Sequence, residues 1–456
     1  MTAAADIPAP ARAVAFGEAV GVWARIAALS FGGPAGQIAV MHRIVVDERR
    51  WVGERRFLHA LNYCMLLPGP EAHQLAIYLG WLMHGVRGGL VAGTLFVLPG
   101  FLVMLGLSAI YAAFGNMGLV AGIFYGLKAA VLAIVLQAVV RIGRRSLGNR
   151  PLALVAAGAF LAIFAFGIPF PLIVLAAGVI GWAATRAGSP HFRPGGHAAA
   201  KDGLAEPDSL LGDWSPDVRG WEALCTPAIL AVLWLAPVAA LVLAFGPDQV
   251  FARLGIFFSQ MAVVTFGGAY AVLAYVAQQA VGHYGWLAPG EMLDGLGLAE
   301  TTPGPLILVV DFVGYLAAWR SPGGLPPWLA GVLGASLVAW VTFLPSFLWI
   351  FFGAPYAERL RGNAALAGAL AAIGAAVVGV ILNLALWFAL HVLFARVVPV
   401  EVLGATLSLP DPRSLDPVAL ALMLGAVVAV FRFDLGLFRL LGAWSLLGLA
   451  CFALGA

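Results

Sequence analysis

The chain has 456 residues, of which 62% are hydrophobic and only 10% are charged. Soluble domains are about 25% charged, so an exterior this poor in charge is expected to face lipid, which excludes a soluble protein. The formal net charge of +3 is too small to indicate nucleic acid as a partner, and the chain lacks the Walker A loop that ATP hydrolysis by that route requires.

Four segments are expected in chain order. Residues 1–15 are an N-terminal tail rich in Ala and Pro, without the pattern of a cleavable signal peptide. Residues 16–185 form a first membrane repeat, with apolar runs that reach the ~20 residues a spanning helix needs. Residues 186–220 are polar and rich in Pro and Gly, and form a hydrophilic linker expected in the cytoplasm. Residues 221–456 contain an extra span and a second membrane repeat.

Two short signatures occur twice, in the same order and at the same spacing. The first is Ser30-Phe31-Gly32-Gly33, matched by Thr265-Phe266-Gly267-Gly268, and the second is Pro68-Gly69-Pro70, matched by Pro303-Gly304-Pro305. A tryptophan lies between them in each copy (Trp51 and Trp286), and all these pairs are offset by 235 residues. Further along the chain the offset becomes 246. Helix breakers at matched positions of a duplicated apolar chain are typical of a secondary transporter.

The distribution of arginines orients the two repeats. The loop 42–56 holds five arginines and its counterpart 277–291 holds none, while 141–150 holds four and 387–396 holds one. Because basic loops stay in the cytoplasm, the repeats are predicted to be inverted, with an extra span over 225–245 producing the inversion. The same rule favours broken or re-entrant helices in 16–41 and 57–83, although short helices that truly cross would also fit. The expected fold is therefore an all-α integral membrane protein, a polytopic helical bundle of two inverted-topology repeats.

The four breaks predict a site for a tetrahedral oxyanion. The N-terminus of a half-helix presents unpaired N–H groups and a partial positive charge of ~0.5, and glycine lets a ligand approach the backbone closely. The alternative is that the glycines only allow close helix packing and the prolines only kink helices. The candidate substrate-binding residues at the breaks are Ser30, Phe31, Gly32, Gly33, Pro34, Pro68, Gly69, Pro70, Thr265, Phe266, Gly267, Gly268, Thr301, Thr302, Pro303, Gly304 and Pro305.

Charged residues inside the apolar segments are candidates for balancing or moving charge. Arg25 lies seven residues before Gly32 and could balance a dianion, with Glu18 as its ion-pair partner; alternatively Arg25 extends to the interface from an interfacial helix. Glu300 directly precedes Thr301 and is the candidate for proton coupling, or it caps the following half-helix. Lys128 is a second cationic candidate, and Asp311 lies in an otherwise apolar run.

Two other classes of protein fit less well. A membrane-embedded enzyme would need a compact cluster, such as two histidines at helical spacing beside a carboxylate, and no predicted helix offers one. A passive channel would tolerate a repeat but gains less from broken helices in both halves. The three cysteines lack the spacing of metal ligands, so we expect neither a metal site nor a cofactor.

The motifs together resemble the chromate ion transporter family in its long, two-domain form. The resemblance covers about residues 16–394 and rests on both signatures, the basic loop that leads to Trp51, and the segments 67–71, 96–99, 265–270 and 300–305. It implies efflux of chromate across the bacterial inner membrane, with sulfate as an alternative substrate. It places the functional positions on the two doubled signatures. His73 and Asp311 depart from the residues expected at their places in this family.

The mechanism expected is secondary transport by alternating access, without ATP. Export of a dianion from a negative-inside cell is assisted by the membrane potential, at ~2.3 kcal/mol per charge per 100 mV, so coupling to a proton is optional. The expected partners are the oxyanion and the lipid bilayer. Nucleic acid is not expected, and a homodimer is left open.

Overall fold

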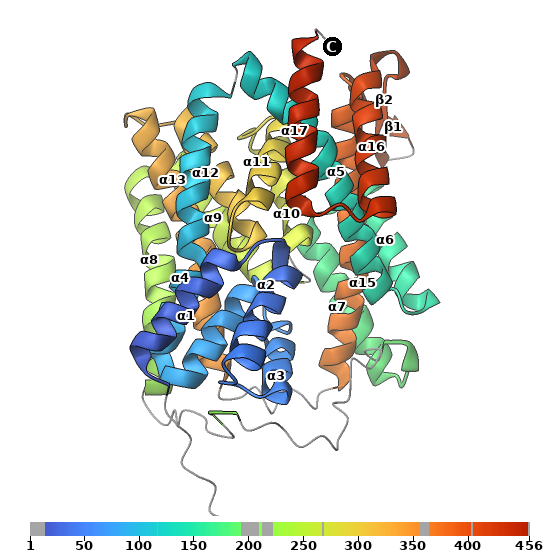
Figure 1. The fold of residues 1–456 in the computed structure, drawn as a ribbon. Coiled ribbons are helices and arrows are strands. Elements are labelled where there is room, and N and C mark those ends of the chain that lie inside the picture. Colours follow the sequence, from blue (N-terminus) through green and yellow to red (C-terminus); the bar gives the residue numbers. More distant parts are fainter. Residues whose placement is uncertain are drawn as a thin grey trace, which may run out of the picture.

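The computed structural model describes residues 14–115, 117–192, 209–211, 222–266, 269–354, 364–402 and 405–454. Most of the predicted tail (residues 1–13), most of the predicted linker, and both Gly267 and Gly268 lie outside these residues. The described chain is almost entirely helical (Figure 1), which confirms the all-α class. The one sheet among the described residues is an antiparallel pair, β1 (Val397–Val402) and β2 (Ala405–Pro410), which the sequence analysis did not foresee.

The first half contains eight principal elements. They are α1 (Phe16–Leu29), α2 (Gly33–His42), the π-helix η1 (Arg43–Glu48), α3 (Glu54–Cys64), α4 (Glu71–Phe114), α5 (Gly118–Ser146), α6 (Arg150–Phe166) and α7 (Phe170–Arg186), followed by the short 3₁₀ turn η2 (Pro190–Phe192).

The second half begins with a long helix, α8 (Glu222–Phe245), which has no counterpart in the first. It continues with α9 (Val250–Val264), α10 (Ala269–Ala277), the π-helix η3 (Gln278–His283), α11 (Pro289–Thr301), the 3₁₀ turn η4 (Leu306–Leu308), α12 (Val309–Arg320), α13 (Pro327–Gly353) and α15 (Ala364–Leu393). After the strands come the turn η6 (Pro412–Ser414), α16 (Pro417–Phe433) and α17 (Leu437–Ala453).

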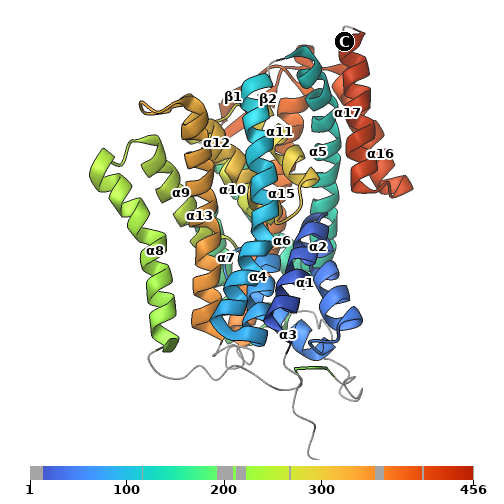
Figure 2. The same ribbon diagram turned by 60° about the vertical axis from the view of Figure 1, so that its left-hand side comes forward.

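Among the described residues, five helices are long and apolar enough to cross a membrane. They are α4, α5, residues 224–245 of α8, α13 and α15. Their axes are roughly aligned with one another (Figures 1 and 2), although the chain does not follow them all in one direction. This confirms a multi-pass membrane protein, and the predicted extra span over 225–245 coincides with one of these five helices.

The helix α4 is a hairpin rather than one rod. Its backbone leaves the helical region at His84 and Gly85, and Gly85 has a φ of +61°. The arms 71–83 and 86–114 then pack back to back, because Gly80 and Gly88 bring their backbones into contact. A Cβ on Gly80 would lie 2.5 Å from the carbonyl oxygen of Gly88. The chain therefore reverses at 84–85, directly after the segment 57–83 that was predicted to be broken or re-entrant.

The elements of the two halves correspond one to one around the added α8 and β-hairpin. The two π-helices, each of six residues, stand at the predicted offset of 235. The N–H of Trp51 donates to the carbonyl of Val45 at 2.9 Å, and the matched N–H of Trp286 donates to that of Ala280 at 2.7 Å. The correspondence also reaches α6 and α7, which match α16 and α17 in length at 17 residues each. The resemblance quoted above stops short of these last helices.

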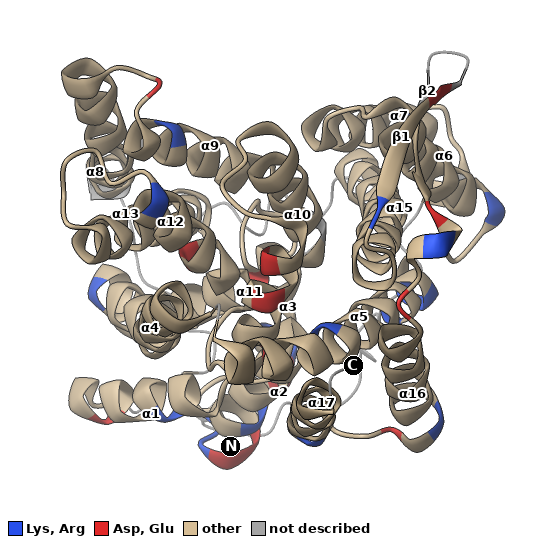
Figure 3. Cartoon of the chain, turned by 90° about the horizontal axis from the view of Figure 1, so that it is seen from above, with Lys and Arg blue, Asp and Glu red and all other residues tan. Residues whose placement is uncertain are grey.

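Seen from above, the helices form two groups, and each group draws on both halves (Figure 3). One contains α1–α4 with α8–α13, and the other contains α5–α7 with α15–α17. Small residues allow the closest packing in the second group. A Cβ on Gly448 of α17 would lie 2.6 Å from the carbonyl oxygen of Gly122 of α5, and the matched Gly181 of α7 meets the carbonyl of Gly368 of α15. The final helices of each half therefore pack on the long helix of the other.

Candidate functional site

The four breaks meet at the centre of the first group in two crossed pairs. The N–H of Gly69, in the first Pro-Gly-Pro, donates to the carbonyl of Thr265 at 2.8 Å. The N–H of Gly304, in the second Pro-Gly-Pro, donates to the carbonyl of Ser30 at 2.7 Å. These two bonds are equivalent at the offset of 235. Each Pro-Gly-Pro segment is therefore bound to the Phe-Gly-Gly segment of the other half, as expected of two copies related by an approximate two-fold axis.

The glycines of the two signatures differ in how much space surrounds them. Gly32 and Gly33 have φ values of +82° and +73°, and among the described residues a Cβ on either would meet no atom within 4 Å. Their backbone therefore faces open space, which does not fit the alternative that these glycines only serve close packing. Gly69 and Gly304, in contrast, are closely surrounded: a Cβ on Gly69 would lie 2.6 Å from Nε2 of Gln74.

The start of α2 offers backbone donors that no described side chain caps. Pro34 stands in its first turn, and among the described side chains none caps this end of the helix. Proline costs nothing at this position because its missing N–H would be unpaired in any case. The arm of α4 that follows Pro70 likewise has no side-chain cap. Unpaired N–H groups at such ends attract anions.

The hydroxyl groups among the candidate binding residues donate to carbonyls of the chain rather than toward a ligand. Ser30 donates to the carbonyl of Ile26 at 2.7 Å, and the equivalent Thr265 donates to Met261 at 2.6 Å. Thr301 and Thr302 donate to carbonyls of their own helix, at 2.7 and 2.9 Å. The backbone amides, rather than these hydroxyl protons, are thus the donors that this conformation offers.

Two glutamines that the sequence analysis did not single out complete the breaks. Nε2 of Gln37 on α2 donates to the carbonyl of Gly304, which adds a third hydrogen bond between the two halves at the breaks. Nε2 of Gln74 on α4 donates to the carbonyl of Pro68 at 2.7 Å. Gln37 and Gln74 are 1% and 0% exposed. Both follow a predicted break by only a few residues, but nothing in the sequence marks them as its partners.

Arg25 does not join the breaks. Its Nη1 lies 3.0 Å from Oε2 of Glu48, and its side chain is 49% exposed. Glu18 instead pairs with Arg49 at 2.9 Å, so the predicted ion pair between Glu18 and Arg25 is wrong. The spacing argument treated 25 and 32 as one helical face, but α1 ends at Leu29 and the chain changes direction before α2. The structure favours the interfacial alternative for Arg25.

Glu300 lies at the end of α11, beside the second break. It is 4% exposed, and Oη of Tyr270 in the first turn of α10 donates to its Oε1 at 2.6 Å. Arg141 on α5 lies within electrostatic range of Glu300. One helical turn further along α5, Nη2 of Arg145 lies 3.6 Å from Sδ of Met65, which is the residue equivalent to Glu300 in the first half. Two arginines on one face of α5 thus approach the two breaks.

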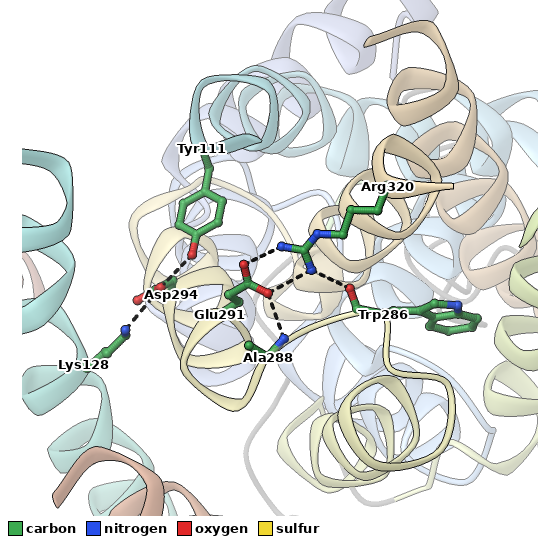
Figure 4. A network of polar contacts seen from close by, with 7 residues as sticks. All are labelled: Tyr111, Lys128, Trp286, Ala288, Glu291, Asp294 and Arg320. Atoms are coloured by element: carbon green, nitrogen blue, oxygen red, sulfur yellow. Dashed lines mark hydrogen bonds and ion pairs between the residues drawn. The ribbon is translucent and has the colours of Figure 1, made fainter. Parts of the chain in front are cut away.

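Lys128 is paired with a buried carboxylate rather than free for an anion. Its Nζ lies 3.5 Å from Oδ2 of Asp294, and Oη of Tyr111 donates to the same oxygen at 2.8 Å. Figure 4 shows Asp294 between these two side chains, next to the pair formed by Glu291 and Arg320. Because Lys128 belongs to the second group and Asp294 to the first, this ion pair joins the two groups. The acidic residues of α11 lie near the middle of the molecule in Figure 3.

A polytopic helical bundle with matched helix breaks at its centre, uncapped backbone donors and buried polar groups defines a membrane transport protein. The model of the chromate transporter family matches residues 18–182 and 252–455. The chain therefore belongs to the chromate transporter family. The two matched regions coincide with the two copies of the repeat and leave out the linker and α8.

Relatives agree with this assignment over most of their length. The chromate transport protein of Pseudomonas aeruginosa is 35% identical over 360 residues, which cover 77% of this chain and 76% of the relative. The chromate transport protein of Cupriavidus metallidurans is 29% identical, with 78% of each chain covered. A probable chromate transport protein of Synechococcus elongatus is 28% identical, with 74% of this chain and 76% of the relative covered. No solved structure matches this chain.

Proposed function

We propose that this protein is a secondary transporter that exports chromate across the inner membrane of a bacterium by alternating access. The observation that carries the proposal is the crossed pairing of the breaks through Gly69 and Gly304, which brings the helix ends of both halves to one place. The relatives named chromate transport proteins supply the substrate. Their printed names describe transport, which supports a transporter over a membrane-embedded enzyme.

The oxyanion is proposed to bind at the breaks through backbone amides. Gly32 and Gly33 leave open space beside the start of α2, and this uncapped helix end carries a partial positive charge of ~0.5. Sulfate has the same shape and charge as chromate, so the same donors suit it and we propose it as a competing substrate. Because the hydroxyl protons of Ser30 and Thr265 are donated within their own helices, both anions are proposed to be bound by the backbone amides.

The membrane potential favours movement of the dianion out of the cell. Moving a dianion out of a negative-inside cell gains ~2.3 kcal/mol per charge per 100 mV. Glu300 is the proposed coupling residue, because it lies beside the second break and Tyr270 holds its carboxylate in place. The two arginines of α5, Arg141 and Arg145, supply positive charge near the breaks without lying in them.

Inversion of the two repeats is part of the proposal. The arginine counts support it, and so does the arrangement in Figure 1, where α3 lies in the lower part of the molecule and its counterpart α11 in the upper part. Alternating access would then exchange the packing of the two helix groups around the central breaks. A homodimer stays a prediction.

Uptake of labelled chromate into everted membrane vesicles tests the function. We expect accumulation above that of vesicles without the protein, competition by sulfate, and loss when the membrane potential is dissipated. Gly32→Leu is expected to abolish uptake while the protein still inserts, since the added side chain fills the space beside the α2 amides. Gly21→Leu is the matched control, because Gly21 also has no atom within 4 Å of an added Cβ but has no positive φ.

Uptake no greater than in empty vesicles would contradict chromate transport. Uptake that continues unchanged after the potential is dissipated would contradict the driving force proposed here. Retained transport in Gly32→Leu would place the anion elsewhere.

A further inference from the structure

Asp311, which the proposed mechanism does not use, is a fully buried acid without a partner. It lies in the first turn of α12, six residues after the second Pro-Gly-Pro, and is 0% exposed. Within the described part of the chain, neither of its carboxylate oxygens has a hydrogen-bond partner. An isolated carboxylate in an apolar interior costs so much free energy that the group takes up a proton instead. Asp311 is therefore neutral in this conformation.

The direction of the Asp311 side chain follows from the packing of α12. Gly314 packs on Val338 of α13, Tyr315 covers Gly331, and the methyl group of Ala318 meets Gly334. Asp311 precedes Gly314 by three residues and Tyr315 by four, so it lies on the same face of α12, toward α13. The two helices are antiparallel and joined by a short turn, which puts Asp311 at the level of residues 338–342.

A stripe of polar groups without partners continues from this level along α13. Thr342 and Ser346 are 2% and 1% exposed, and among the described residues their hydroxyls have no hydrogen-bond partner. This differs from Ser30, Thr265 and Ser336, whose hydroxyls donate to a carbonyl one turn earlier. Thr342 and Ser346 are four residues apart and share one face of the helix.

The stripe ends at the proposed oxyanion site. A Cβ on Gly69 would lie 3.1 Å from Oγ of Ser346, so this hydroxyl stands beside the first Pro-Gly-Pro. Gln74, which also borders Gly69, has a buried Oε1 without a partner among the described residues. Polar groups that lack partners therefore run from Asp311 to the break, where a ligand or water would satisfy them.

No ionised group compensates Asp311 from the surrounding helices. The neighbours of α12 are η4 and α13, which hold no ionisable group, and α4, α9 and α11. The ionisable residues on these three are Glu71, His73, Tyr78, His84, Arg87 and Tyr111 on α4, Arg253 on α9, and Glu291, Asp294 and Glu300 on α11. The hydrogen bonds and ion pairs of Tyr111, Arg253 and the three α11 acids join them to groups other than Asp311. Within the described chain, no hydrogen bond joins either oxygen of Asp311 to any of these groups.

The other half shows that the fold does not require this stripe. At the equivalent positions the first half has Ala76, Phe96 and Gly100 in place of Asp311, Thr342 and Ser346. Ala76 and Phe96 are buried, and the two arms of α4 pack as a hairpin in the same way as α12 and α13. An apolar set thus supports the same architecture, and the polar set is a property of one half alone.

We propose that Asp311 is a proton-binding site of the transport cycle, connected to the oxyanion site by the hydroxyls of Thr342 and Ser346. This inference rests on the proposed transport function. When the cycle admits water to the stripe, the carboxyl group releases its proton to water and becomes a carboxylate; it takes up a proton again before it is buried. Protonation removes a negative charge from the neighbourhood of a dianion, so proton binding and anion binding favour each other.

Infrared spectroscopy of the purified protein tests the proton site without any assumption about the substrate. We expect the carbonyl stretch of a protonated carboxylic acid at neutral pH in the wild type and in Glu300→Gln, and its loss or reduction in Asp311→Asn. A spectrum of Asp311→Asn that keeps the full band would overturn the proposal. Asparagine preserves the size of the side chain, so the variant is expected to fold.

Proton movement in liposomes tests the role of the site in transport. Chromate flux through the wild-type protein is expected to change the internal pH, as reported by a trapped dye, beyond the change in protein-free liposomes. In Asp311→Ala, which installs the residue found at position 76, we expect chromate flux driven by the potential to continue and the pH change per chromate moved to be clearly smaller than in the wild type. An undiminished pH change in this variant would overturn the proposal, whereas absence of chromate flux in the wild type would instead count against the proposed function.

Discussion

The N–H of Gly69 and the carbonyl of Thr265, 196 positions apart in the sequence, are joined by a hydrogen bond of 2.8 Å. The equivalent bond from Gly304 to Ser30 runs in the opposite sense between the halves. Backbone groups freed at the breaks of one half are therefore hydrogen-bonded to backbone groups at the breaks of the other half. Since an unpaired peptide group in an apolar interior costs several kcal/mol, neither half is expected to keep its breaks without the other.

Adding a side chain at Gly69 should lower both the stability of the protein and its transport activity. Its φ is +129°, and the methyl group of Gly69→Ala would approach Gln74 and Ser346. Strain of this kind costs ~1–3 kcal/mol, so we expect a lower melting temperature in detergent and reduced chromate uptake. Gly106→Ala, within the helix α4 that follows this break, is the control, since a Cβ there meets no atom of the described residues within 4 Å. Equal melting temperatures for the two variants would disprove the prediction.

A side chain at Gly448 should separate α17 from α5. The valine of Gly448→Val would collide with the backbone of Gly122 and Gly126. Overpacking of this kind costs ~1–3 kcal/mol, which thermal unfolding of the purified protein would detect. Gly181→Val is expected to do the same between α7 and α15, because Gly181 holds the equivalent place. Gly442→Val on α17 should be neutral, as nothing lies within 4 Å of its added Cβ; a comparable loss there would argue against the packing role.

Breaking the ion pair of Lys128 should leave Asp294 as an unpaired buried charge. Asp294 is 4% exposed, and removing one partner of a buried pair costs about 3 kcal/mol or more. Lys128→Met is therefore expected to destabilise the protein, and the double variant with Asp294→Asn to recover part of the loss. Arg253→Met, which breaks an exposed pair with Asp248, should cost at most about 1 kcal/mol. Single and double variants of equal stability would show that the pair is not coupled.

Removing the hydroxyl group of Tyr270 tests the coupling role of Glu300. Tyr270→Phe deletes the hydrogen bond to Oε1, and a bond to a charged group contributes ~1.5–3 kcal/mol. We expect chromate uptake to become less dependent on the pH gradient in Tyr270→Phe and in Glu300→Gln alike, with protein levels unchanged. Tyr275→Phe on the same helix is the control. If the pH dependence stays that of the wild type in both variants, Glu300 has no part in coupling.

Reporter fusions test the inversion of the repeats. Positions 50 and 279 lie in equivalent parts of the two halves, next to and within the two π-helices. We expect reporters there to lie on opposite sides of the membrane, and a reporter at Arg144 to agree with the one at Arg50 because both loops are rich in arginine. Reporters at 50 and 279 on the same side would rule out an inverted arrangement.

Local sequence predicted the helix breaks but not the side chains that surround them in space. The breaks at 30–34, 68–70 and 303–305 were predictable because Gly and Pro act on their own backbone, whatever surrounds them. The position of Arg25 was not, because its distance from Gly32 in space depends on how the chain turns at the break. Gln37 and Gln74 carry no distinctive motif, and their role became visible only when the carbonyls of Gly304 and Pro68 were found within their reach.

The sequence by itself determined that this protein crosses the membrane, that its two halves repeat, and that each half breaks its helices at matched glycines and prolines, because these are properties of composition and of single residues. Only the tertiary structure decided that the breaks of one half are bonded to those of the other and that the last helices of each half pack on the long helix of its partner half. It also decided that Asp311 has no hydrogen-bond partner among the described residues. Those relationships depend on contacts between segments far apart in the chain, which no local pattern records.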